Sequence, residues 1–303
     1  MVATVTVISV EVTPSPEPDH SLLPPLTGVP RSARRLVVLG DSTAVGLGDP
    51  LPNRGGWRGV GPLVAEALGV EPDGYLNPSF TGARMGCVLT KQLPAAVAHR
   101  PDVALVVAGM NDTLRPDFSA ERIAADLTEV IRALAAVGTT VVPVRYHDHG
   151  KVFRLPGSLR RALSERVAEL NAAIDGVVER EGVPCLDLEL LPGAYDLTAW
   201  SVDRLHPSEL GHRMLATAFA GELELAGYAI ETPVSLECAG GAAIAAWQHV
   251  AWLVLKGIPW LWRRGSDLVP YAFTVLFRTA VGDSRHSSWA TWTNYSQENS
   301  VNS

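Results

Sequence analysis

Arg35-Leu-Val-Val-Leu-Gly-Asp-Ser42 is the stretch that predicts the fold of this chain of 303 residues. Its residues 36–39 are all apolar and two of them are β-branched, with no alternation of polar and apolar positions. Such a run is expected for a short strand that is buried on both faces of a parallel sheet. Gly40 ends the run, and the polar pair Asp41-Ser42 follows directly.

The same pattern continues on the C-terminal side of this stretch. Further apolar runs predict strands at 103–108, 139–144 and 183–188. Between and around them, helical spacing predicts helices at 57–68, 118–137, 159–181 and 208–225, with Ser119 as the N-cap of the second one. This alternation predicts an α/β fold, a three-layer α/β/α sandwich with a mostly parallel sheet. Active sites in such sheets lie outside the carboxyl ends of the strands.

The composition excludes several classes of protein. The formal charge is −7, from 25 basic and 32 acidic residues, which argues against a general nucleic-acid binder. The three cysteines are far apart and form neither a CxxC pair nor a zinc pattern. Because residues 1–12 lack the basic and long apolar regions of a secretory signal, we expect a cytoplasmic protein.

The two ends of the chain differ from its middle. Residues 1–32 are rich in proline and predict an irregular arm, before an α/β domain at 33–230. A Trp-rich amphipathic helical extension is predicted at 231–280 and a disordered polar tail at 281–303. Within the extension, 240–265 is locally basic. It is interpreted either as a helix that packs on the domain or on a second copy of the chain, which we favour, or as a peripheral membrane contact.

Three polar clusters follow strands or precede a helix, where a site is expected. They are Gly40-Asp-Ser42, Gly109-Met-Asn-Asp112 and Asp203-Arg-Leu-His206. A serine needs an adjacent base to act as a nucleophile, and His206 can serve if Asp203 orients it. Asn111 can donate a hydrogen bond to the oxyanion of a tetrahedral intermediate. The order and placement of the three clusters predict catalysis.

Each cluster also has a structural interpretation. Ser42 could be a helix cap, Asn111-Asp112 an Asx turn, and His206 an exposed loop residue. Asp187 is a rival carboxylate for His206. His147-Asp-His149 resembles a metal cluster, but it lacks a third ligand and is expected to be a solvated loop. No metal, nucleotide or other cofactor is predicted.

The sequence resembles the SGNH hydrolases, also called the GDSL esterase/lipase family, over residues 35–229. The resemblance is carried by Gly40-Asp-Ser42, by Gly82 in NPSFTGAR, by Gly109-x-Asn-Asp112 and by Asp203-x-x-His206. The longer strings GDSTAVGLGDP and WSVDRLHPSELGH are similar to members of actinobacterial type. Position 44 is alanine, so the Gly-x-Ser-x-Gly elbow of the α/β-hydrolases is absent.

The resemblance implies a flavodoxin-like sandwich and ester hydrolysis through an acyl-enzyme. It implies Ser42 as the nucleophile, His206 as the base and Asp203 as its orienting carboxylate. The oxyanion hole would consist of the backbone N–H of Ser42, the backbone N–H of Gly82 and the side chain of Asn111, with Gly86 nearby as a rival for Gly82. The expected substrate is a small-molecule or lipid ester. Two alternatives stay open: an acyltransferase with the same residues, and a lipid- or membrane-surface binding protein that acts through the C-terminal segment.

Overall fold

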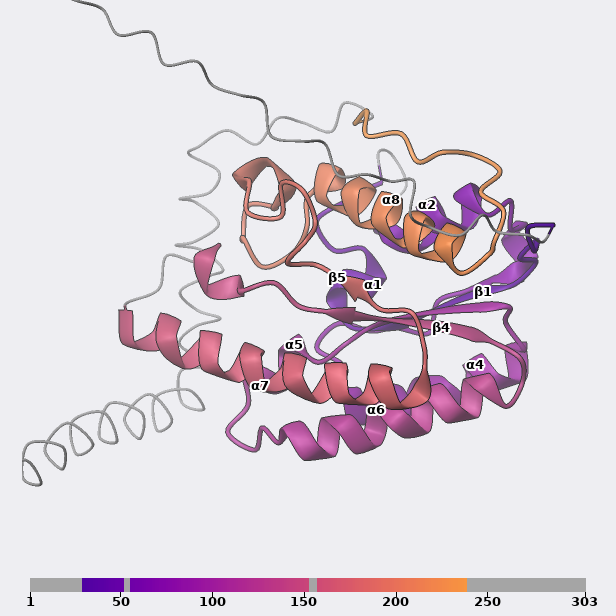
Figure 1. The fold of residues 1–303 in the computed structure, drawn as a ribbon. Helices are drawn as coiled ribbons and strands as arrows, with labels where there is room; N and C mark the ends of the chain where they lie inside the picture. Colours follow the sequence, from indigo (N-terminus) through magenta and orange to yellow (C-terminus); the bar gives the residue numbers. More distant parts are fainter. Residues whose placement is uncertain (1–28, 52–54, 153–156, 239–303) are drawn as a thin grey trace, which may run out of the picture.

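A five-stranded parallel sheet forms the centre of the domain, with the strand order β2-β1-β3-β4-β5. The computed structural model describes residues 29–51, 55–152 and 157–238 (Figure 1). Within them the strands are β1 (Leu36–Gly40), β2 (Tyr75–Leu76), β3 (Val103–Val107), β4 (Thr140–Arg145) and β5 (Leu186–Asp187). The predicted α/β class is confirmed, and this strand order is that of flavodoxin-like folds.

The two strands in the middle of the sheet are the most deeply buried. β1 and β3 are buried at every position and pair in register from Leu36 with Val103 to Gly40 with Val107. Their continuous apolar runs therefore contact helices on both faces, as the sequence of β1 predicts.

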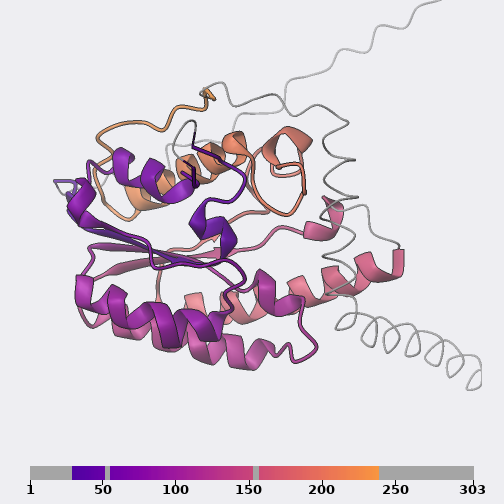
Figure 2. The same ribbon diagram turned by 180° about the vertical axis from the view of Figure 1, so that it is seen from behind.

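Helices cover both faces of the sheet (Figures 1 and 2). On one face lie α2 (Val60–Ala67) and α8 (Glu209–Leu225); on the other lie α4 (Leu93–His99), α6 (Ala120–Ala135) and α7 (Gly157–Glu181). The short elements are α1 (Ser42–Val45), η2 (Pro72–Gly74), α3 (Met85–Cys87), the π-helical turn η3 (Val88–Gln92), α5 (Met110–Thr113), η4 (His149–Lys151) and η5 (Leu197–Ala199). Ser119 caps α6 as predicted, because its side chain accepts a hydrogen bond from the Arg122 N–H.

Some boundaries differ from the sequence prediction. Helix α2 begins at Val60 rather than at position 57, because Gly59 has a φ of +71° and Trp57 pairs with Pro50 in an isolated β-bridge. Strand β5 is shorter than predicted, at Leu186–Asp187. The two-residue strand β2 and the helical stretch from α3 to α4 were not predicted from the sequence.

The ends of the described chain pack on the domain. Arg31 forms an isolated parallel bridge with Tyr228, and the Glu231 N–H donates to the Ala67 carbonyl at 2.8 Å. Residues 231–238 run without helix or strand, and the Ser235 carbonyl accepts a hydrogen bond from Arg213. The predicted arm up to residue 28, the extension from 239 and the tail lie outside the described residues. None of the helices in the described ranges is long and apolar enough to cross a membrane.

Candidate active site

Ser42 lies where the strand order of the sheet reverses. β1 is followed by α1 and α2 on one face, whereas β3 is followed by α5 and α6, and α6 lies on the opposite face (Figure 1). The loops after β1 and β3 therefore diverge and leave a crevice between them. Ser42 is the first residue of α1, and Asp41 caps this helix by accepting a hydrogen bond from the Thr43 N–H.

The end of β1 is held by a residue that the sequence analysis missed. The side chain of Gln92 is fully buried and forms two hydrogen bonds of 2.8 Å with the backbone N–H and carbonyl of Gly40. Gly40 has a φ of +148°, and a Cβ atom there would lie 2.1 Å from the Val107 carbonyl oxygen. Only glycine fits at this position, and the two hydrogen bonds with Gln92 set the direction in which Asp41 and Ser42 leave the sheet. No motif marks Gln92 in the sequence.

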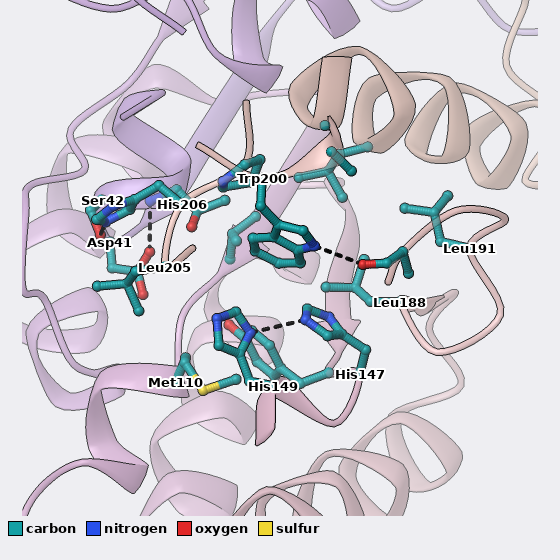
Figure 3. A pocket seen from close by; sticks show the side chains of 18 of the residues that line it. Asp41, Ser42, Met110, His147, His149, Leu188, Leu191, Trp200, Leu205 and His206 are labelled. Carbon is teal, nitrogen blue, oxygen red and sulfur yellow. Dashed lines mark hydrogen bonds between the residues drawn. The ribbon is translucent and has the colours of Figure 1, made fainter. Parts of the chain in front are cut away.

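Ser42, His206 and Asp203 form a continuous chain of hydrogen bonds. The Ser42 Oγ lies 2.8 Å from the His206 Nε2 (Figure 3). The His206 Nδ1 lies 2.7 Å from the Asp203 Oδ2. Ser42 and His206 are each 8% exposed. The structure thus brings together three residues that are up to 164 positions apart in the sequence.

The loop that carries Asp203 is organised around its carboxylate. The Asp203 Oδ1 accepts hydrogen bonds from the Ser201 hydroxyl and from the N–H groups of Leu205 and His206. Burial raises the pKa of Asp203, but its hydrogen bonds with His206 and Ser201 outweigh burial and lower the pKa to about 2. Arg204 has a φ of +53°, an uncommon conformation for a residue other than glycine. Asp203 is therefore an anion that fixes the His206 ring by two contacts, one to the ring and one to the backbone.

Asp187, the rival carboxylate, contacts a different partner. Its Oδ2 forms an ion pair of 3.0 Å with Arg145, and its Oδ1 accepts a hydrogen bond from the Glu189 N–H. The carboxylate that hydrogen-bonds the His206 ring is the one from Asp203.

Asn111 lies in the crevice near Ser42, on helix α5. Its Nδ2 donates to the Asp41 Oδ2 and to the Ala83 carbonyl, each at 3.1 Å. Gly82 precedes Ala83 and is therefore next in the chain to this contact, although it does not line the pocket itself. Its φ of +80° and the open space around its Cβ position identify it as a turn glycine.

The two aspartates of the predicted motifs are buried and hydrogen-bonded to backbone groups. Burial raises the pKa of Asp41 to about 6, although the hydrogen bond from the Thr43 N–H and the charge of His206 act to lower this pKa. Burial also raises the pKa of Asp112, whose carboxylate accepts hydrogen bonds from the Met85 N–H and from Arg84. The contacts of Asp112 join the loop after β3 to the start of α3.

A prediction for the loop after β4 is wrong. His147 and His149 are not solvated, because each is only 4% exposed and both line the pocket beside Ser42 (Figure 3). Both rings are buried because they pack against each other and against Trp200, which comes from a distant loop. In the described part of the chain no group of three His, Cys, Asp or Glu side chains is placed to hold a metal ion.

The pocket that contains Ser42 and His206 is a cavity of about 90 Å³. Its walls come from the loops that follow β1, β3, β4 and β5 and from the start of α8. Apart from the polar groups already described, the lining is largely apolar and includes Met110, Leu188, Leu191, Trp200, Met214 and Leu215.

Comparisons with known proteins agree with this architecture. The model of the GDSL-like lipase/acylhydrolase family matches residues 38–214. The chain is similar to LAE5, an α/β hydrolase enzyme from the metagenome of Lake Arreo, with 19% identity and a TM-score of 0.50 over 63% of this chain and 95% of that one. It is also similar to a protein assigned to the lipolytic G-D-S-L family from Desulfitobacterium hafniense, with 11% identity and a TM-score of 0.50 over 62% and 99% of the two chains.

No curated protein matches the sequence. The likeness to the two solved structures bears on the fold, whereas the family match covers more than half of the chain and includes Ser42 and His206. This chain belongs to the GDSL-like lipase/acylhydrolase family, the SGNH hydrolases.

Proposed function

We propose that this protein is a serine hydrolase that cleaves carboxylic esters or thioesters through an acyl-enzyme on Ser42. The observation that carries the proposal is the hydrogen-bonded chain from the Ser42 Oγ to His206 and on to Asp203. Because Asp203 is anionic and accepts the proton on Nδ1, the His206 Nε2 has a free electron pair directed at the Ser42 hydroxyl.

In this mechanism the His206 Nε2 takes the hydroxyl proton as the Ser42 Oγ attacks the carbonyl carbon of the ester. The protonated His206 then gives that proton to the leaving alcohol or thiol, and the acyl group stays on Ser42. Water, deprotonated by His206, attacks the acyl-enzyme in the same way and releases the acid. Asp203 stabilises the imidazolium in both halves of the reaction.

The oxyanion hole of this proposal consists of the backbone N–H groups of Ser42 and Gly82 and the side chain of Asn111. Asn111 is supported by its place in the pocket lining beside Ser42. In the resting structure its two amide hydrogens point at Asp41 and Ala83. Asn111 therefore shares or exchanges one of these bonds when the tetrahedral intermediate forms.

The test is hydrolysis of p-nitrophenyl acetate and butyrate by the wild type and by Ser42→Ala, with Ser235→Ala as the matched control. Ser235 is an exposed serine that does not line the pocket. We expect activity in the wild type and in the control and none above background in Ser42→Ala. A fluorophosphonate probe should label the wild type at Ser42. Equal rates in all three proteins, with no label on Ser42, would sink the proposal.

Acyl transfer to an alcohol uses the same residues, since only the acceptor of the acyl group differs. Product analysis with added short alcohols distinguishes the two, because a transferase forms a new ester in preference to the free acid. The membrane or self-association role of 240–265 lies outside the described residues and stays a prediction, as do the actinobacterial type and the cytoplasmic compartment.

A further inference from the structure

Three aromatic rings line the pocket beside the Ser42–His206 pair. We call His147, His149 and Trp200 the ring cluster. The ring centroids are 4.9 Å apart for His147 and His149, 5.1 Å for His147 and Trp200, and 4.9 Å for His149 and Trp200. All three side chains line the same cavity as Ser42 and His206.

Hydrogen bonds hold each member of the ring cluster in place. The His149 Nδ1 lies 2.9 Å from the His147 Nε2, and His149 also hydrogen-bonds the backbone of Arg204. The Trp200 indole donates from Nε1 to the Ala194 carbonyl at 2.9 Å. Burial lowers the pKa of His147 to about 4 and that of His149 to about 3, so both rings are neutral at pH 7. A neutral and hydrogen-bonded cluster of this kind resists displacement by a ligand.

The ring cluster lies in the middle of the pocket. In Figure 3 the Trp200 indole and the two imidazoles lie between the Ser42–His206 pair and the side chains of Leu188 and Leu191. The part beyond the ring cluster is apolar, with Leu188, Leu191 and Ala194 in its lining. An acyl chain that starts on Ser42 would therefore contact the ring cluster before it could reach these leucines.

We propose that the ring cluster limits the acyl group of the substrate to a short chain, of about two to four carbons, and that Trp200 is the residue that determines this length. The acyl group is the part of the substrate that must fit in the pocket, because it stays bonded to Ser42 after the alcohol has left. The cavity of about 90 Å³ is also smaller than the ~150 Å³ of an engineered cavity that holds benzene. This inference rests on the proposed function.

Truncation of the ring cluster should widen the passage from Ser42 to Leu188 and Leu191. Each further methylene that becomes buried against Leu188 and Leu191 contributes about fourfold to kcat/KM. Octanoate has four methylenes more than butyrate. We therefore expect the ratio of kcat/KM for p-nitrophenyl octanoate over butyrate to rise by about tenfold or more in Trp200→Ala, since part of the gain is lost to imperfect packing.

The experiment compares this ratio in the wild type, Trp200→Ala, His149→Ala and the control Leu190→Ala. Leu190 is in the same loop as Leu188 and Leu191, but it is 78% exposed and does not line the pocket. A fifth protein carries Trp200→Ala together with Leu191→Trp, which fills the space beyond the ring cluster. We expect this second change to remove the gain in octanoate activity.

Two results would overturn the inference while leaving the proposed function intact. One is a ratio that stays within twofold of the wild type in both Trp200→Ala and His149→Ala when each is folded and active on acetate. The other is a gain in Trp200→Ala that follows the length of the alcohol, measured with acetate esters of longer alcohols, rather than the length of the acyl group. If Trp200→Ala does not fold, the His149→Ala ratio alone decides. If the wild type shows no activity that depends on Ser42, the proposed function itself is refuted instead.

Discussion

Replacing Asp203 by asparagine should abolish most of the activity while leaving the loop intact. The Oδ1 of asparagine can still accept the hydrogen bonds that Ser201, Leu205 and His206 donate to the Asp203 Oδ1. The amide NH₂ would then face the His206 Nδ1–H, which in the wild type donates its proton to the Asp203 Oδ2. Two donors cannot share this contact, so the ring must change tautomer and present Nε2–H to Ser42, where it can no longer accept a proton.

The structure sets the size of the effect. The pKa of Asp203 falls from 3.8 to about 2, which corresponds to about 2 kcal/mol of preference for the ionised carboxylate in the folded site. Its side chain is only 16% exposed, so little of this is screened by solvent. Asparagine keeps the hydrogen bonds from Ser201 and the backbone but removes the charge beside His206, and the wrong tautomer extends the loss of rate toward the ~10⁴-fold that the same change causes in serine proteases. We expect kcat/KM to fall by a factor between about 10² and 10⁴.

The assay is p-nitrophenyl acetate hydrolysis at pH 7.5, together with urea unfolding to show that the variant is folded. Asp187→Asn is the matched control, because Asp187 pairs with Arg145 and not with His206, and it should retain activity within a factor of about three. Less than a tenfold loss in folded Asp203→Asn would refute the role of Asp203, and an equal loss in Asp187→Asn would show that the effect is not specific to the carboxylate on His206.

Three further changes test other parts of the site. Asn111→Ala should lower kcat by about 10²–10³ with little change in KM, measured by steady-state kinetics; an unchanged kcat would remove Asn111 from the oxyanion hole. The pKa of Asp41 is raised from 3.8 to about 6 by burial, so its neutral form stabilises the fold below about pH 4, and this contribution is lost as the pH rises through 6. Urea unfolding should therefore show the wild type losing up to about 3 kcal/mol relative to Asp41→Asn between pH 4 and pH 8, and a difference independent of pH would contradict this. Gly48→Ala should lower kcat more than about tenfold, because its Cβ would lie 1.9 Å from the carbonyl oxygen of Pro207, next to His206, in a backbone with a φ of +99°; full activity would show that the loop adjusts without moving His206.

The sequence was sufficient for the fold class and for the candidate residues of the site. The apolar runs of β1 and β3 predict strands buried on both faces, since only a sheet covered by helices on each side removes such runs from water. Ser119 marks the start of α6 through local hydrogen bonding, which needs no distant residue. The candidate residues Ser42, Asn111 and His206 follow from motif order and from their expected places at strand ends and a helix entrance.

Long-range packing decided what local patterns do not contain. Gln92 clamps Gly40 from 52 positions away, and no feature of either residue's neighbourhood in the sequence indicates this contact. The choice between Asp187 and Asp203 also depends on where two loops meet, which is a property of the assembled sheet. His147 and His149 were expected in a solvated loop because no third metal ligand is evident in the sequence. They are buried because Trp200, from a loop some fifty positions later, packs against both rings. The sequence by itself determined which residue types the site has available, whereas the tertiary structure decided which of them meet, because burial and side-chain contacts depend on segments that the chain brings together only on folding.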